Sequence, residues 1–148
     1  MFRKNYILKN LILAITFLLC LCSCSNDDDS TNQTSNFETL IVGEWQLIES
    51  YDNEELISLG ECELMTTFNF DSNNEFGFVD VFTNTNGNCS VFSILIGTYT
   101  ISESILTYTL SSGDISQVQI TQLNTTLLEL TVSTDDGTLT KVYSKISS

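Results

Sequence analysis

The feature that most constrains the fold is a succession of short segments, from Leu40 to Ile146, in which apolar and polar residues alternate. A period of two places alternate side chains on opposite faces of a β-strand, and β-branched and aromatic residues favour that conformation. Turn residues separate the segments, and no helical periodicity of useful length is present apart from one turn in the EELISL stretch. The predicted strands are 43–51, 63–70, 75–82, 90–101, 105–110, 115–123, 126–132 and 138–146.

Most of the predicted connections are short enough to be hairpins, which join antiparallel neighbours. A meander of eight strands is long enough to close on itself, and closure removes both exposed sheet edges. We therefore predict an all-β fold, an eight-stranded antiparallel up-and-down barrel. A two-sheet sandwich would explain the same spacing. An eight-stranded barrel has room for side chains or for one small ligand.

The N-terminal residues have the layout of a secretory signal, with a basic start and a short apolar run. Arg3, Lys4 and Lys9 come without an acid, and the apolar run covers residues 11–21. These eleven residues are too few for a membrane-spanning helix, which needs about 20. We therefore expect residues 1–23 to be a cleaved signal peptide.

The end of this signal resembles the lipobox of bacterial lipoproteins, in which an apolar residue at −3 and a small residue at −1 precede the modified cysteine. Leu21 and Ser23 take these places before Cys24. Cys20 and Cys22 fit less well because leucine would stand at the cleavage position. The resemblance implies that Cys24 is acylated, and two or more acyl chains give stable membrane anchoring. The alternative is an ordinary cleaved signal with incidental cysteines.

The segment after Cys24 is polar and begins with three aspartates, 27–29. No apolar residue precedes Phe37, so residues 24–36 cannot bury enough surface to fold and we expect a flexible tether. Its start resembles the export tag of surface lipoproteins in the Bacteroidetes group. That resemblance implies an outer-membrane lipoprotein displayed at the cell surface, and a merely solvated tether on a periplasm-facing anchor is the alternative. Residues 37–148 then form the barrel domain.

The charge balance and the absence of histidine exclude several classes of function. After residue 23, two lysines stand against nineteen acids, which gives the mature chain a net charge of −17. Such a chain repels phosphate backbones, which argues against a nucleic-acid partner. A sequence without histidine has no Ser-His-Asp or Cys-His catalysis and no histidine-ligated zinc or haem. We expect no enzymatic activity, no cofactor and no metal site.

Two cysteines remain for the barrel domain. Cys62 lies just before the second predicted strand and Cys89 just before the fourth. These strands run in the same direction in a meander, so both cysteines lie at the same end of the barrel, where their loops can meet. A disulfide is the expected state in an oxidising compartment. Two free thiols or a metal pair are the alternatives, although two cysteines without histidine make a poor zinc site.

The first predicted strand opens with Gly-Glu-Trp at residues 43–45, which resembles the Gly-x-Trp signature of the lipocalins. Residues 40–42, Leu-Ile-Val, match the apolar segment that plugs the barrel bottom in that family. The order of these motifs along the chain resembles that in lipocalin-like lipoproteins common in Bacteroidetes. After the Gly-x-Trp motif come Cys62, then Asn-Gly-Asn-Cys ending at Cys89, then Gly-Thr-Tyr ending at Tyr99. The resemblance covers roughly residues 40–146 and implies a barrel that binds a small hydrophobic ligand.

The sequence departs from the lipocalin pattern at one position. In lipocalins an arginine from late in the barrel packs over the motif tryptophan, whereas this chain has no arginine after Arg3. Lys141 or Lys145 could take its place, because a lysine stem covers a ring while its charge makes a cation–π contact. The alternative is that Trp45 is simply a core residue.

The candidate ligand-binding residues are inward-facing aromatics and one acid, namely Trp45, Phe68, Phe78, Asp80 and Tyr99. By alternation, Asp80 shares a face with Phe76, Phe78 and Phe82, and Glu49 shares one with Trp45, Leu47 and Tyr51. A carboxylate among aromatics could fix a ligand's polar end or act as an acid. Two such carboxylates could in principle hydrolyse a glycoside. The alternative is that both lie near a barrel mouth or face water.

The loops DSNNE at 71–75 and STDDG at 133–137 cluster oxygen ligands. Neither matches the twelve-residue calcium loop, and both have the residues that hairpin turns need. Two function classes therefore remain, a ligand-binding barrel and a surface interaction module with a filled interior. A cavity of about 300 Å³ or more, the lower end for ligand pockets, would favour the first class.

Overall fold

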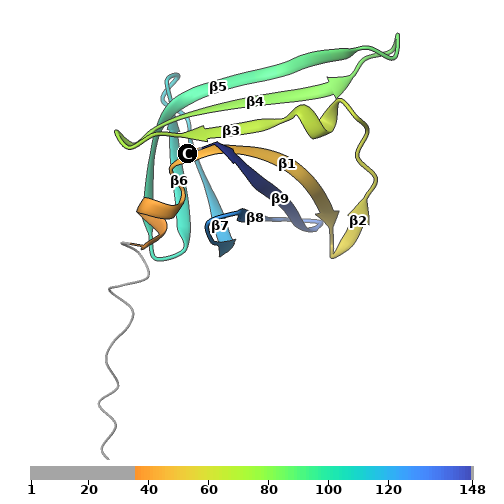
Figure 1. The fold of residues 1–148 in the computed structure, drawn as a ribbon. Coiled ribbons are helices and arrows are strands. Elements are labelled where there is room, and N and C mark those ends of the chain that lie inside the picture. Colours follow the sequence, from red (N-terminus) through yellow and green to blue (C-terminus); the bar gives the residue numbers. More distant parts are fainter. Residues whose placement is uncertain (1–35, 148) are drawn as a thin grey trace, which may run out of the picture.

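A computed structural model describes residues 36–147 of the protein, most of which form one antiparallel sheet (Figure 1). The expected signal peptide, 1–23, the expected acylation site, Cys24, and all but the last residue of the expected tether lie outside the described residues. The strands are β1 (Gly43–Asp52), β2 (Glu55–Ile57), β3 (Thr67–Phe70), β4 (Glu75–Thr83), β5 (Cys89–Ser102), β6 (Ile105–Leu110), β7 (Ile115–Leu123), β8 (Leu127–Thr134) and β9 (Gly137–Ser147).

Eight of these strands close into a barrel. The order is β1-β3-β4-β5-β6-β7-β8-β9, and β9 pairs back onto β1, with Trp45 opposite Lys145 and Tyr51 opposite Thr140. Every pairing is antiparallel, and the last pairing covers the sheet edges that an open meander would expose. The predicted eight-stranded up-and-down barrel is therefore confirmed.

The connection between the first two barrel strands differs from the sequence-based expectation. The short strand β2 folds back onto the end of β1, with Tyr51 opposite Leu56. The second barrel strand begins at Thr67, because Glu63–Met65 form the 3-10 helix η2. Hydrogen bonds from Met65 N to Cys62 O and from Thr66 N to Glu63 O close this helical turn. The predicted strand 63–70 is thus wrong over its first residues.

A β-bulge changes which side chains of β1 face inward. The β1–β9 register shifts between Leu47 and Glu49, and an extra residue in one strand reverses the faces beyond it. Ser50 is consequently buried and Glu49 is exposed. The Tyr51 hydroxyl donates a hydrogen bond to Glu49 Oε2 (2.6 Å). The expectation that Glu49 and Tyr51 share the face of Trp45 is therefore wrong.

A second bulge lies in β5, where this strand pairs with β4. The register shifts between Asp80 and Val81. Val81 is buried, whereas Phe82 is exposed and stacks edge-on against exposed Phe92 (centroids 5.9 Å apart). Asp80 accepts a hydrogen bond from the buried Thr66 Oγ1 (3.2 Å). Because the extra residue, Phe92, lies in β5, the alternation of β4 itself is not interrupted, and Phe82 is exposed although it has the parity of Phe76 and Phe78.

The core fills one end of the barrel. Helical residues 36–40 precede β1, and Phe37 and Leu40 pack against the buried cluster. Members of the cluster come from every barrel strand: Ile41, Trp45, Leu47, Phe68, Phe70, Phe76, Tyr99, Ile101, Leu106, Val118, Ile120, Leu123, Leu128, Leu130 and Tyr143. Ile41 and Trp45 are completely buried. This end, which includes the start of β1 and the end of β9, is the closed end of the barrel.

The β4–β5 hairpin is long and extends beyond its neighbours (Figure 1). β5 pairs with β6 from Gly97 onward, and Ile96 O accepts a hydrogen bond from Ser111 N (2.9 Å), so within the described part of the chain 89–95 pair with β4 alone. At Gly97 a Cβ atom would collide with the Thr109 carbonyl oxygen, so the glycine permits the close approach of β5 and β6. Val91, Phe92, Ile94 and Ile96 are exposed on the extended part of β5, and no residue between Val81 and Ser102 is charged.

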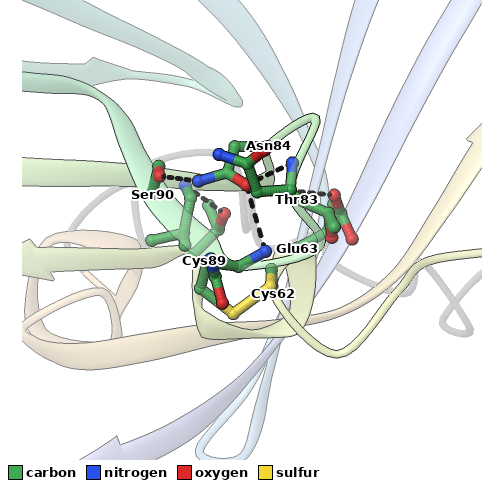
Figure 2. Close-up of a disulfide and its surroundings, with 10 residues drawn as sticks. Cys62, Glu63, Thr83, Asn84, Cys89 and Ser90 are labelled. Atoms are coloured by element: carbon green, nitrogen blue, oxygen red, sulfur yellow. Dashed lines mark hydrogen bonds between the residues drawn. A yellow bond between two sulfur atoms is a disulfide. The ribbon is translucent and has the colours of Figure 1, made fainter.

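A disulfide joins Cys62 to Cys89 (Figure 2). The bond ties the connection after β2 to the start of β5, at the barrel end that the strand directions predicted. Glu63, beside Cys62, accepts a hydrogen bond from the Thr83 backbone N–H (3.0 Å), and this bond lowers the pKa of the Glu63 carboxyl. Asn84 Nδ2 donates to Ser90 Oγ (2.8 Å), so polar contacts surround the disulfide.

Removing this disulfide should destabilise the barrel substantially. The bridge spans 27 residues, and closing a loop of that length in the unfolded chain contributes about 3–3.5 kcal/mol. We expect the Cys62→Ala/Cys89→Ala double variant to lose about this much free energy of unfolding in a urea titration. Wild-type protein unfolded in reducing buffer is the control and should match the double variant. A loss below about 1 kcal/mol would show that the bridge contributes little to the free energy of unfolding.

Candidate ligand-binding site

The barrel encloses a cavity of about 210 Å³ on the side away from the closed end. Its wall is mainly apolar and comes from seven strands, β3 to β9. The lining residues are Phe68, Phe76, Phe78, Leu95, Tyr108, Leu110, Ser116, Val118, Leu130, Val132, Leu139, Lys141 and Tyr143. Such a wall suits an apolar molecule, because burying apolar surface is the main source of binding free energy in such sites.

Aromatic contacts form one side of the cavity. The rings of Phe68 and Phe78 lie with centroids 4.4 Å apart, and Phe68 meets Tyr143 edge-on at 5.5 Å. Phe76 and Tyr108 are 5.3 Å apart. Tilted and edge-to-face pairs are the arrangements that aromatic rings prefer. These rings therefore hold one another in place and give the cavity a defined wall.

The five residues predicted to contact a ligand occupy different places. Phe68 and Phe78 line the cavity, so both could contact a ligand bound there. That contact itself remains a prediction. Trp45, Asp80 and Tyr99 are not among the lining residues. Tyr99 is buried, and its hydroxyl donates a hydrogen bond to the Asp71 carbonyl oxygen (2.9 Å). Its contacts hold the strand connection at the closed end.

Trp45 is held at the closed end by a hydrogen bond and by the ammonium group of Lys145. Its indole Nε1 donates a hydrogen bond to the Ile41 carbonyl oxygen (2.7 Å). The Lys145 ammonium lies 4.9 Å from the Trp45 ring centroid and donates to the Leu40 carbonyl oxygen (3.1 Å). Lys145 therefore takes the place that an arginine has in lipocalins, and it ties β9 to the segment that covers the barrel bottom.

Sequence reasoning did not identify Lys141 as a cavity residue. Its neighbours across the sheet are Ser50 on β1 and Leu130 on β8, and both are buried. Lys141 therefore belongs to the inward face of β9 and lines the cavity. The strand alternation contained the signal, because Leu139, Lys141 and Tyr143 share one parity in the last predicted strand.

The two cavity tyrosines are neutral at physiological pH. Burial raises the pKa of Tyr108 to about 12. Burial also raises the pKa of Tyr143, and the neighbouring Tyr108 and Asp80 add to this effect. Both phenols consequently stay protonated, so they can offer a ligand hydrogen bonds but no charge.

The described residues offer no arrangement for a metal. Within residues 36–147 no group of three or more Cys, Asp or Glu side chains is placed to hold an ion. The oxygen-rich loop 71–75 uses Asp71 for its own turn, because Asp71 Oδ1 accepts from the backbone N–H groups of Asn73 (2.8 Å) and Glu75 (2.9 Å). The part of the chain that is described contains no helix long and apolar enough to cross a membrane.

Comparison with known proteins bears on the fold and the family of the chain. The sequence matches the family of lipocalin-like domains over residues 41–130. A lipocalin-like protein from Bacteroides uniformis has a similar structure, with a TM-score of 0.51 and 14% identity over 72% of this chain and 98% of that chain. A protein from Bacteroides eggerthii has a TM-score of 0.49 and 14% identity over 71% of this chain and 98% of that chain.

A crustacean structure shows a weaker likeness. Lobster apocrustacyanin A1 has a TM-score of 0.46 and 13% identity, over 84% of this chain and 71% of that chain. No curated protein is similar enough in sequence to match the chain. At these identities, structural likeness bears on the fold alone.

Proposed function

The chain belongs to the lipocalin-like domain family, and we propose that its barrel binds one small, mainly apolar molecule in the interior cavity. The observation that carries the proposal is the apolar space of about 210 Å³ that side chains leave inside the closed barrel. Proteins of this family are typically binding proteins rather than enzymes. The proposed activity is accordingly binding without catalysis.

The volume of the cavity limits the size of the ligand. About 210 Å³ falls short of the ~300 Å³ expected above of a ligand-binding barrel, so the apolar lining and not the volume supports the proposal. We therefore expect a ligand the size of a medium-length alkyl chain rather than a retinoid or a porphyrin.

We also propose that the mature protein is a lipoprotein of the outer membrane, displayed at the cell surface with Cys24 as its acylated first residue. The basic start, the apolar run over 11–21 and the sequence before Cys24 support the anchor. The aspartates at 27–29 support surface display. In this arrangement the barrel binds its ligand at the membrane without being embedded in it.

A surface interaction module is the second candidate function. Its support is the extended part of β5, where Phe92, Ile94 and Ile96 expose 59–71% of their surface. This part of the strand also has one unpaired backbone edge, and such edges can pair with a strand of another chain. Failure of the binding test below would make this candidate the better account.

Blocking the cavity should abolish binding while the fold survives. Val132 lines the cavity but is partly exposed at the end of β8, so Val132→Trp should place an indole in the cavity mouth with little strain on the core. The core cluster lies within residues 37–143, so residues 25–148 produced without lipid can be used. We expect wild-type protein to bind octanol saturably in a calorimetric titration, and Val132→Trp to weaken that binding at least about tenfold.

Ile94→Trp is the matched control, because it adds the same side chain on the exposed outer face of β5. That variant should bind octanol like the wild type. Saturable binding that Val132→Trp leaves unchanged would place the ligand outside the cavity. If no small apolar molecule binds the wild type, the ligand-binding proposal is wrong.

A further inference from the structure

The cavity wall contains a single charged side chain, Lys141. The mature chain has one other base, Lys145, which is engaged at the closed end by Trp45 and the Leu40 carbonyl. Of the two lysines, one therefore stabilises the barrel bottom and the other faces the proposed binding space. The two lysines lie at different points along β9, and Lys141 is four residues closer than Lys145 to the β8–β9 hairpin.

Lys141 has no negative partner within residues 36–147. No carboxylate of the described residues forms an ion pair with it, and its sheet neighbours are the neutral Ser50 and Leu130. Asp80 accepts a hydrogen bond from Thr66 and does not line the cavity. The cavity tyrosines stay protonated, so neither of them supplies a negative charge.

An ammonium group beside apolar walls is unfavourable without an opposite charge, because part of its hydration is lost. A ligand that brings an anionic group to Lys141 restores an electrostatic partner in surroundings where charge-assisted hydrogen bonds are strong. A ligand with a cationic head adds repulsion instead. The charge of Lys141 therefore favours ligands with an anionic head group, while the apolar wall favours ligands with an apolar body.

We propose that Lys141 makes the cavity selective for a small apolar molecule with one anionic head group, such as a medium-chain carboxylate. This inference rests on the proposed binding function and specifies its ligand class. The alkyl part would lie against Phe68, Phe78 and Leu130, and the head group would accept hydrogen bonds from the Lys141 ammonium. Asp80, which sequence reasoning considered for the polar end of a ligand, is not among the residues that line this cavity.

The acidic exterior of the protein works against an anion at long range. A net charge of −17 in the mature chain repels anions, but salt screens this repulsion beyond about 8 Å at physiological ionic strength. Contact with Lys141 is a short-range interaction and is screened much less. Titrations at physiological ionic strength therefore measure binding in the cavity with little influence from the net charge of the protein.

Three probes of the same chain length separate head-group charge from apolar fit: octanoate, octanol and octylamine. At neutral pH they present an anionic, a neutral and a cationic head on the same alkyl chain. In calorimetric titrations of residues 25–148 we expect octanoate to bind about tenfold more tightly than octanol, and octylamine to bind more weakly than octanol. Lys141→Met, which keeps a long apolar stem, should lose the preference, so that this variant binds octanoate no more tightly than it binds octanol.

Lys141→Arg and Lys145→Met are the matched controls. The arginine variant keeps the positive charge and should keep the preference for octanoate. The Lys145→Met variant removes the other lysine, outside the cavity, and should also keep that preference. Equal binding of octanoate and octanol by the wild type, or a preference that survives Lys141→Met, overturns the role of Lys141 while binding itself stands. If none of the three probes binds, the proposed function fails together with this inference.

Discussion

Replacing Trp45 with alanine should lower the free energy of unfolding by about 3–5 kcal/mol, the range for deleting a buried aromatic side chain. Trp45 is completely buried at the closed end. The variant loses the indole packing, leaves the Ile41 carbonyl without the Nε1–H donor, and removes the ring beneath the Lys145 ammonium. Since native domains are stable by only about 5–15 kcal/mol, this change removes a large share of the total.

This effect can be measured by urea unfolding monitored with far-UV circular dichroism, which does not depend on the fluorescence of the tryptophan that the variant lacks. Ile94→Ala is the control, because Ile94 is exposed on the outer wall and its truncation should change stability by no more than about 0.5 kcal/mol. Trp45→Phe should fall between the two, since it keeps a ring but loses the hydrogen bond. A loss below about 1 kcal/mol for Trp45→Ala would contradict the structural role of the closed end.

Replacing Cys24 with alanine should abolish acylation and association with the outer membrane. Cys24 is the expected attachment site of the acyl chains, each of which contributes about 0.8 kcal/mol per buried CH₂ group to membrane binding. We expect labelling with an alkyne fatty acid to disappear, and the protein to leave the detergent phase in a partitioning assay. The barrel should stay folded, because its core lies within residues 37–143.

Cys22→Ala is the matched control for this anchor. Cys22 lies two residues before Cys24, in the expected signal peptide, so its replacement should leave acylation and membrane association intact. If Cys22→Ala removes the label and Cys24→Ala does not, the mature chain begins at a different cysteine. If Cys24→Ala protein is still acylated and partitions with detergent, the assignment of the anchor is wrong.

Sequence alternation predicted the barrel well because it reports which side of a strand is buried. Seven of the eight predicted strands correspond in full to observed strands within one or two residues at each end. The exception, 63–70, contains a 3-10 turn next to Cys62, where local hydrogen bonds replace pairing. The strand directions also placed Cys62 and Cys89 at one barrel end, where the disulfide is found.

Alternation could not predict the candidate site to the same degree. Phe68 and Phe78 lie on strand segments without a bulge before them, so counting by two put them on the inward face that lines the cavity. Glu49 and Tyr51 lie beyond the bulge in β1, where one extra residue reverses every later face. A bulge depends on how two strands pair, so the sequence of one strand alone does not predict it.

The sequence by itself determined the class of the fold, the order of its strands and the chemistry that is excluded, because these depend on local alternation, turn residues and composition. Only the tertiary structure decided that Lys145 covers Trp45 while Lys141 faces the cavity, since the two lysines have the same parity on β9 and differ only in what lies opposite them. The structure also decided the size of the cavity, about 210 Å³. A cavity is the space left after side chains from seven strands have packed together, so its volume depends on all of them at once.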